Sequence, residues 1–198
     1  MPESSPPVSR TEILNCTQLA SIREQWHSQR SDLWVFGYAS LIWKQEFEFT
    51  ERRAARVHGW HRALQMWSTI NRGSPKCPGL VFALLSGGSC QGVVFRIPKA
   101  QANQALDDLW FREMPGDVYE PRWLNCQTDR GIVPALAFTL PRTNPSFCGA
   151  LSPAQYRQIF SKARGRYGTT LDYAQRTYDC LLAEGIHDHA LETILKLQ

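Results

Sequence analysis

LWVFGYASLI, residues 33–42, carries the clearest structural signal in the sequence. Its first four residues are all apolar, which is typical of a strand buried on both faces, and Gly37 ends the apolar run. The small residues Ala39 and Ser40 follow, so a ligand could approach this backbone closely. The stretch therefore predicts a buried strand that continues directly into a loop.

The loop after this strand is the first candidate binding site. A chain that leaves a strand at a glycine can present successive backbone N–H groups outward, and such a nest suits a carboxylate or a phosphate. An ordinary transition from strand to turn would produce the same pattern, so both interpretations stay open. The candidate ligand-binding residues are Gly37, Tyr38, Ala39, Ser40, Leu41 and Ile42.

Strand-like runs dominate the middle of the chain. After the first strand they cover residues 57–66, 80–84, 91–97, 117–126 and 132–140. Residues 86–89 contain two adjacent glycines, which supply the positive φ of a tight turn. The sequence therefore predicts a hairpin whose two strands are residues 80–84 and 91–97.

Helical patterns flank these strands. Residues 13–26 carry apolar side chains at helical spacing, and Pro98 opens a helix whose apolar stripe reaches Trp110. The C-terminal helices are expected over residues 152–165 and 170–185 and from Asp188 onward. Because helices do not alternate with strands, the fold class is α+β, with a mostly antiparallel, barrel-like sheet and C-terminal helices.

Composition and charge narrow the possible functions. Hydrophobic residues make up 43% and charged residues 20% of the 198-residue chain, as in an ordinary globular protein. The net charge is +4, yet no basic run is longer than Arg52-Arg53. Nucleic-acid-binding proteins cluster their basic residues in a stripe, so we expect no nucleic-acid partner. A surface of this kind suits anionic small molecules.

The cysteines and the N-terminus indicate a cytoplasmic protein. The six cysteines include no C-x-x-C pair, so reduced thiols are expected rather than a zinc site or a disulfide framework. Residues 1–10 read as an unstructured tail without the apolar core of a signal peptide. No run approaches the length of a membrane helix. Nothing in the sequence predicts an oligomeric state.

Glu113 is the candidate acid or base. It follows Leu106, Leu109 and Trp110 at helical spacing, so it extends the stripe that should face the core. A carboxyl group held against Trp110 in a poorly solvated cleft would have a raised pKa and could act as a base near neutral pH. Two other interpretations stay open: the helix could fray before Glu113, or Glu113 could simply pair with Arg112.

Other catalytic arrangements are not supported. His58 and His61 lie three residues apart in strand-like sequence and so point to opposite faces. Ser40 lacks the G-x-S-x-G context of a nucleophile elbow, and no phosphate-binding loop of the G-x-x-x-x-G-K-[ST] type occurs. We expect no metal site and no nucleotide cofactor.

Several ordered motifs together resemble the ChaC family. WVFGYASLIW, residues 34–43, is similar to that family's signature V-F-G-Y-G-S-L-I-W. Residues 67–80, 88–96 and 109–119 are similar to its later blocks, and the likeness spans about residue 33 to the C-terminus. The chain is therefore divided into residues 1–32, a tail with an amphipathic helix, and residues 33–198, a γ-glutamylcyclotransferase-like domain.

The resemblance implies a fold, a reaction and a site. It implies a compact α+β domain around a small β-barrel that cleaves glutathione to 5-oxoproline and cysteinylglycine without metal, nucleotide or flavin. Residues 37–42 would hold the γ-glutamyl group and Glu113 would accept a proton. Tyr119 and Tyr173 would line the pocket. Two alternatives are a cyclotransferase for other γ-glutamyl compounds and a non-catalytic module that binds such ligands.

One position departs from the signature. Ala39 stands where the family has glycine, and alanine costs about 1 kcal/mol if the backbone there needs a positive φ. If the position needs only a small side chain, alanine is nearly neutral. Since glutathione is an anion, a basic rim is also expected, and Arg62, Arg72 and Arg96 are its candidates.

Overall fold

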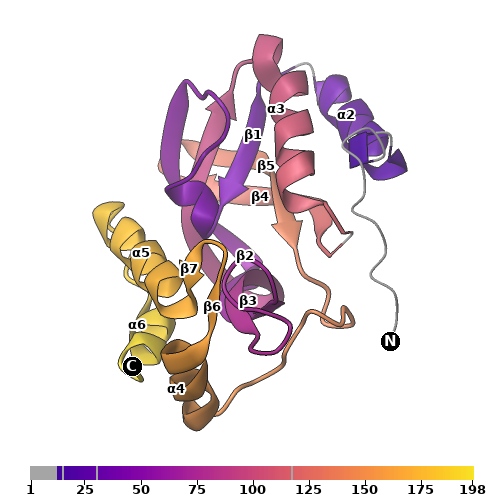
Figure 1. The fold of residues 1–198 in the computed structure, drawn as a ribbon. Helices are drawn as coiled ribbons and strands as arrows, with labels where there is room; N and C mark the ends of the chain where they lie inside the picture. The colour runs from indigo at the N-terminus through magenta and orange to yellow at the C-terminus, as the bar shows by residue number, and fades with distance from the viewer. Residues whose placement is uncertain (1–12, 15, 30, 117) are drawn as a thin grey trace.

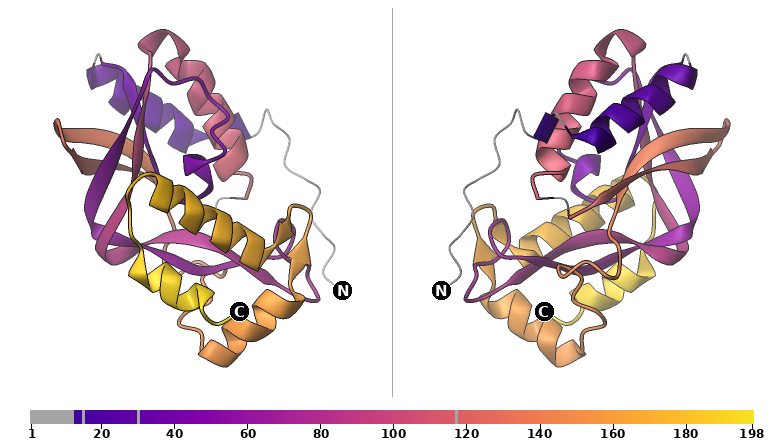
Figure 2. Two further views of the ribbon diagram at one scale, coloured as in Figure 1. Left: turned by 90° about the vertical axis from the view of Figure 1, so that its left-hand side faces the viewer. Right: turned by 90° about the vertical axis from the view of Figure 1, so that its right-hand side faces the viewer.

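The computed structural model describes residues 13–14, 16–29, 31–116 and 118–198 (Figure 1). The tail predicted over residues 1–10 lies outside the described residues. Five strands close into a barrel, with α2 and α3 at one end of the molecule and α4, α5 and α6 at the other (Figure 2). The predicted α+β class and the barrel are both confirmed.

The barrel contains one parallel contact in an otherwise antiparallel sheet. Its strands are ordered β1-β3-β2-β4-β5, and β1 and β5 meet in parallel at Val35 and Leu136. All other pairings are antiparallel. The bounds are Leu33–Gly37 for β1, Glu51–Ser68 for β2, Gly79–Ile97 for β3, Glu120–Thr128 for β4 and Gly131–Thr139 for β5.

The predicted hairpin at residues 86–89 is wrong. The structure has one continuous strand there, β3, which pairs with β2 on both sides of the glycines. Gly87 and Gly88 do have positive φ angles of 97° and 73°, but the register shifts between His58 and Trp60 on the opposite strand. The glycines therefore form a bulge that bends a long ribbon instead of reversing the chain.

Two helices pack together beside β1. The helix α3 (Lys99–Glu113) buries the predicted stripe, including Leu106, Leu109 and Trp110. The helix α2 (Thr17–Gln29) lies against it, and Trp26 is only 1% exposed within the same apolar cluster. The indole nitrogen of Trp110 donates to Cys16 Sγ over 3.0 Å. The N-terminal helix is thus packed tightly on the element that ends at Glu113.

The C-terminal helices begin within one residue of the predicted starts. Ser152 forms a capping box with Gln155 at the start of α4 (Pro153–Lys162). Thr169 forms another with Asp172 at the start of α5 (Thr170–Ala183), and Asp188 caps α6 (His189–Leu195). The short strands β6 (Arg164–Gly165) and β7 (Gly168–Thr169) join α4 to α5.

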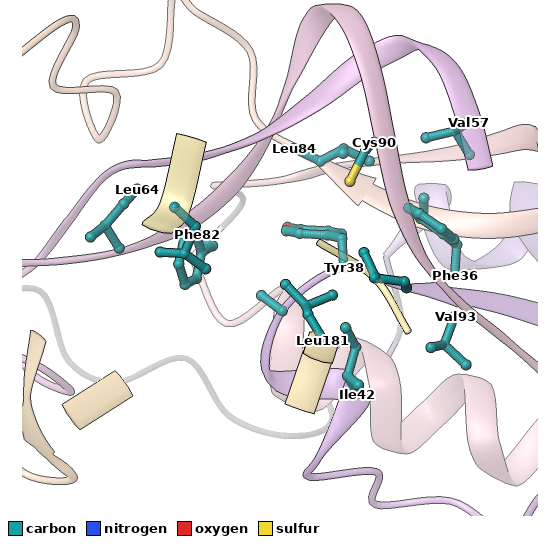
Figure 3. Close-up of a cluster of buried hydrophobic side chains, with 14 of the residues drawn as sticks. Phe36, Tyr38, Ile42, Val57, Leu64, Phe82, Leu84, Cys90, Val93 and Leu181 are labelled. Atoms are coloured by element: carbon teal, nitrogen blue, oxygen red, sulfur yellow. The ribbon is translucent and has the colours of Figure 1, made fainter. Parts of the chain in front are cut away.

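The helix α5 covers the loop that follows β1. Figure 3 shows the shared cluster, in which Tyr38 and Ile42 lie near Leu181 of α5. Side chains of β3 complete it, among them Phe82, Leu84, Cys90 and Val93. This packing fixes the loop between the barrel and α5. In the described part of the chain, no helix combines the length and apolar character needed to cross a membrane.

Candidate active site

The loop after β1 folds back sharply on the end of its own strand. A Cβ atom at Gly37 would lie 3.1 Å from Leu41 Cβ and 3.1 Å from a ring carbon of Phe95, so glycine permits the close approach. The short helix η1 (Ser40–Ile42) follows at once. The backbone N–H of Ile42 donates to the carbonyl of Ala39 over 2.9 Å, which closes the turn.

The N–H groups at the start of η1 are available to a ligand. The first N–H groups of a helix have no partner within it, and those of Ser40 and Leu41 donate no hydrogen bond to another described residue. Both residues line a cavity. These two residues therefore bring backbone donors that have no other described partner to the wall of the cavity.

The backbone at Ala39 does not need glycine. Its φ angle is −145° and its ψ angle is −119°, so Ala39 is not in the left-handed region and the departure from the family signature brings no left-handed strain. The side chain is 6% exposed and lines the cavity. The position therefore demands a small side chain and not a positive φ.

One cavity of about 320 Å³, its open mouth included, joins the loop to Glu113. Four lining residues come from the loop and five from elsewhere in the fold: Tyr38, Ala39, Ser40, Leu41, Phe82, Glu113, Tyr119, Phe138 and Tyr173. Residues from the loop after β1 to α5 thus meet at one place. Of the candidate loop residues, Gly37 and Ile42 do not line the cavity, and Ile42 belongs to the apolar core.

Glu113 is both buried and paired. It is the last residue of α3, so the helix does not fray before it, and its side chain is 16% exposed. Burial raises the pKa of its carboxyl group, while the charge and hydrogen bond of Arg112 oppose the rise and the charge of Glu46 adds to it. The net direction is upward, as a base that works near neutral pH requires.

Arg112 connects Glu113 to the loop. Its Nε donates to Glu113 Oε1 over 2.9 Å, and its NH2 donates to Ser40 Oγ over 3.0 Å. Its NH1 donates to the carbonyl of Lys44. The sequence pattern suggested the pair with Glu113 but not the bond to Ser40, which is 72 residues away and depends on how the barrel closes.

Three tyrosines surround the carboxyl group. Burial is the main cause that raises the hydroxyl pKa values of Tyr38, Tyr119 and Tyr173, and the charge of Glu113 contributes to each rise. The Tyr38 hydroxyl donates to the carbonyl of Phe138 over 3.1 Å. All three phenols stay protonated near neutral pH. Because the Tyr38 hydroxyl donates to Phe138, Tyr119 and Tyr173 are the two that can offer a hydrogen bond to a ligand.

The candidate arginines of the basic rim have three different positions. Arg62 is buried, forms an ion pair with Asp188 and donates a hydrogen bond to the carbonyl of Tyr38, so it stabilises the loop. Arg96 pairs with Asp32 and with Glu51. Only Arg72 of the three contacts a lining side chain, because its guanidinium lies 4.9 Å from the ring centre of Tyr173.

The histidines take no part in this cavity. The Nδ1 atom of His61 lies 2.8 Å from the carbonyl oxygen of Gly87, at the bulge of β3. Among the residues that the structure describes, no three His, Cys, Asp or Glu side chains gather closely enough to hold a metal ion. The site is instead built from one carboxyl group, its arginine, phenols and backbone donors.

Comparison with known proteins agrees with this geometry. Residues 33–197 match the family model described as ChaC-like protein. A glutathione-specific γ-glutamylcyclotransferase of Escherichia coli K12 is 34% identical over 82% of this chain and 71% of its own length. A mouse protein, glutathione-specific γ-glutamylcyclotransferase 1, is 33% identical over 82% of this chain and 76% of its length.

A solved structure shares the fold. It is a crystal structure of a γ-glutamyl cyclotransferase specific to glutathione from yeast, with a TM-score of 0.74 and 22% identity. It covers 84% of this chain, and this chain covers 95% of it. With its barrel, its loop after β1 and a family match over nearly all of residues 33–198, the chain belongs to the ChaC-like family.

Proposed function

We propose that this chain is a γ-glutamylcyclotransferase that converts glutathione to 5-oxoproline and cysteinylglycine. The observation that carries the proposal is the buried carboxyl group of Glu113, which shares a cavity with the loop Tyr38–Leu41. The names of the E. coli and mouse relatives support glutathione as the substrate.

The reaction is a ring closure within the substrate. The α-amino nitrogen of the γ-glutamyl group attacks the γ-carbonyl carbon, and the bond from that carbon to the cysteine nitrogen breaks. The proton lost by the amine passes to the leaving nitrogen, so no water is consumed. Because the nucleophile belongs to the substrate, the protein has to select the folded conformer and move the proton.

Glu113 moves that proton. An α-amino group titrates near pH 8 and is mostly ammonium at neutral pH, so a base must remove a proton before the nitrogen can attack. A carboxyl group whose pKa is raised by burial is suited to accept it and then to return it to the leaving amine. Acid–base catalysis of this kind contributes about 10²–10⁴-fold to the rate.

The loop binds the γ-glutamyl group. Ser40 and Leu41 line the cavity, and their N–H groups would hold a negative oxygen, either the α-carboxylate or the oxyanion of the tetrahedral intermediate. The phenols of Tyr119 and Tyr173 supply further donors around the same space, and the Tyr38 hydroxyl can accept. Arg112 holds the carboxyl group of Glu113 at a fixed place relative to this loop.

A cytoplasmic location is part of the proposal. All six cysteines are free thiols, as expected in a reducing compartment.

Incubation of the purified chain with glutathione tests the function. We expect 5-oxoproline and cysteinylglycine in equal amounts, and no glutamate. Glutamate in place of 5-oxoproline would mean hydrolysis, and a lack of any product would leave only a binding role. A parallel panel of γ-glutamyl amino acids and γ-glutamyl amines separates glutathione specificity from a broader cyclotransferase activity.

A further inference from the structure

Arg72 occupies a rigid position beside the cavity. Its backbone is enclosed by two glycines, since a Cβ atom at Gly79 would lie 2.1 Å from Arg72 O and one at Gly165 would lie 2.5 Å from Arg72 N. No side chain fits at either glycine without moving the backbone. The N–H of Arg72 also donates to Ser68 Oγ over 3.0 Å. Three segments of the chain thus fix where this side chain begins.

The guanidinium group of Arg72 has no carboxylate partner among the described residues. Its charged carbon lies 4.9 Å from the ring centre of Tyr173, and its NH1 donates to the carbonyl of Tyr167. Partial burial lowers its pKa, which means that its charge is partly desolvated. The charge of Asp172 acts on it, but that carboxylate accepts the N–H of Thr169 in the helix cap.

Two other cations near the cavity are already paired with acids, whereas Arg176 lies over the ring of Trp43 and adds a second positive charge close to Arg72. Arg112 is bonded to Glu113 over 2.9 Å, and Lys44 pairs with Glu46 over 3.1 Å. A partly buried cation without a paired anion is unfavourable unless a ligand supplies the anion. Arg72 is therefore a partly buried cation beside the cavity that lacks an anionic partner among the described residues.

Tyr173 is a neighbour of both Glu113 and Arg72. Burial raises the pKa of the Tyr173 hydroxyl to about 12, the charge of Glu113 adds to the rise and the charge of Arg72 opposes it. The phenol therefore lies within the field of both groups. A carboxyl base and a positive charge therefore both act on this one side chain.

The substrate has a matching arrangement of charges. In the proposed function the γ-glutamyl amine lies at Glu113, which lines the cavity. From the γ-carbonyl carbon the cysteinylglycine part extends by roughly 7 Å, the length of two extended residues. Its carboxylate would arrive on the side of the Tyr173 ring where Arg72 lies.

We propose that Arg72 binds the carboxylate of the glycyl end of glutathione and so distinguishes the tripeptide from γ-glutamyl compounds that lack this carboxylate. The inference rests on the proposed function and names the specificity-determining contact of the same site. Planar guanidinium groups are well suited to this role, because they bind a carboxylate through two parallel hydrogen bonds.

The test compares glutathione with glutathione monoethyl ester, in which the glycyl carboxylate is blocked. For the unmodified chain we expect kcat/KM to be roughly 10- to 100-fold lower with the ester, as for a lost charge-assisted hydrogen bond. In Arg72→Met the kcat/KM values for the two substrates should differ by less than about threefold, because the value for glutathione falls to that for the ester. Arg72→Lys should keep part of the preference.

Arg130→Met is the matched control. Arg130 lies in the turn between β4 and β5, its side chain is 67% exposed, and Glu51 is its partner. It should keep the full preference for glutathione. Two results would overturn the inference: equal use of both substrates by the unmodified chain, or an equal loss on both substrates in Arg72→Met. The first of these results is measured on the unmodified chain alone. Lack of 5-oxoproline with unmodified chain and glutathione would instead contradict the proposed function itself.

Discussion

At the scale of single residues, the site depends on opposing effects on one carboxyl group. Burial raises the pKa of Glu113 and Arg112 lowers it, so the arginine adjusts how basic the carboxylate is while holding its position. The groups that face Glu113 are Arg112 on α3, Glu46, and the phenols of Tyr38, Tyr119 and Tyr173. Of these, Arg112 alone stabilises the charged form by a direct ion pair.

Arg112→Gln should move the acid limb of the pH–rate profile to higher pH. The base must be deprotonated to act, so kcat/KM falls as the pH drops through the pKa of Glu113. Loss of the arginine charge leaves the effect of burial unopposed and raises that pKa further. The measurement is kcat/KM for glutathione across pH, with Arg130→Gln as control. Coinciding acid limbs in Arg112→Gln and the unmodified chain would show that Arg112 does not act on the base.

Ser40→Trp should abolish glutathione binding. The side chain of Ser40 lines the cavity and accepts from Arg112, and an indole there would fill the space beside the free N–H groups. Ala39→Gly is the matched change in the same loop. Because φ at Ala39 is −145°, glycine relieves no left-handed strain there. Activity should stay within about twofold, and the free energy of unfolding should fall by no more than about 1 kcal/mol. Normal turnover by Ser40→Trp would remove the loop from the site.

The sequence predicted the two halves of the site but not their connection. The apolar run ending at Gly37 and the stripe ending at Glu113 each gave a candidate from local pattern. The contributions of Phe82 and Phe138, and the bond from Arg112 to Ser40, depend on strand pairing between distant segments. Local periodicity carries no information on such pairing.

At the scale of elements, the N-terminal helix supports the element that carries Glu113. We propose that residues 33–198 form the catalytic domain and that α2 is an extension that stabilises α3. The evidence is the shared apolar cluster of Leu19, Ile22 and Trp26 with Trp110, together with the ion pair between Arg23 and Asp107. This packing is more extensive than a loosely attached appendage would require.

Trp26→Ala should destabilise the protein without changing its chemistry. The side chain is 1% exposed and its indole nitrogen donates to the carbonyl of Ser31 over 3.0 Å. Removing a buried tryptophan typically costs about 3–5 kcal/mol of unfolding free energy. Below the new melting temperature, kcat and KM for glutathione should stay within about threefold. A folded variant with a large loss of kcat would place α2 in the catalytic domain.

In the ribbon formed by β2 and β3, two adjacent glycines form a bulge where the sequence pattern predicted a turn. Adjacent glycines at residues 87 and 88 favour a turn in isolation, yet the flanking residues of β3 continue to pair with β2. Ladder hydrogen bonds and burial on both sides outweigh the local preference for reversal. Sequence pattern alone does not distinguish a bulge from a turn, because both use a positive φ.

Gly79→Ala should disturb the segment that holds Arg72. Its Cβ atom would lie 2.1 Å from the carbonyl oxygen of Arg72, so the backbone must move, at a cost of about 1–3 kcal/mol or more. Gly116→Ala is the control, because its Cβ atom would have only Val118 within reach, at 3.9 Å. Thermal unfolding of both variants checks this expectation. Equal melting temperatures would show that the close packing around Arg72 is not required.

At the scale of the whole molecule, closure of the barrel brings the site together. The parallel contact between β1 and β5 and the antiparallel contact between β1 and β3 fix the strand from which the loop leaves. Cavity residues then come from the loop after β1, η1, β3, α3, the segment before β4, β5 and α5, which span most of the chain. The sequence predicted strand-like runs in each of the five barrel strands and the barrel class, but it divided β3 into two strands, and strand order follows from long-range packing and not from any single segment.

Burial of Glu113 also affects the stability of the whole fold. A carboxyl group whose folded-state pKa is raised contributes stability that is fully present below its unfolded pKa, near 4.3, and lost as the pH rises through the folded-state value. At neutral pH the charged Glu113 therefore opposes folding. A glutamine, which is neutral at every pH and similar in volume, should not lower the melting temperature at pH 7.

Glu113→Gln, assayed for 5-oxoproline release and thermal unfolding side by side, tests the central claim most directly. We expect a protein that melts no lower than the unmodified chain at pH 7, still binds glutathione, and loses about 100-fold or more in kcat. Glu24→Gln, an exposed position on α2, should change neither property. A Glu113→Gln protein that melts normally and turns over glutathione at the unmodified rate would contradict the account.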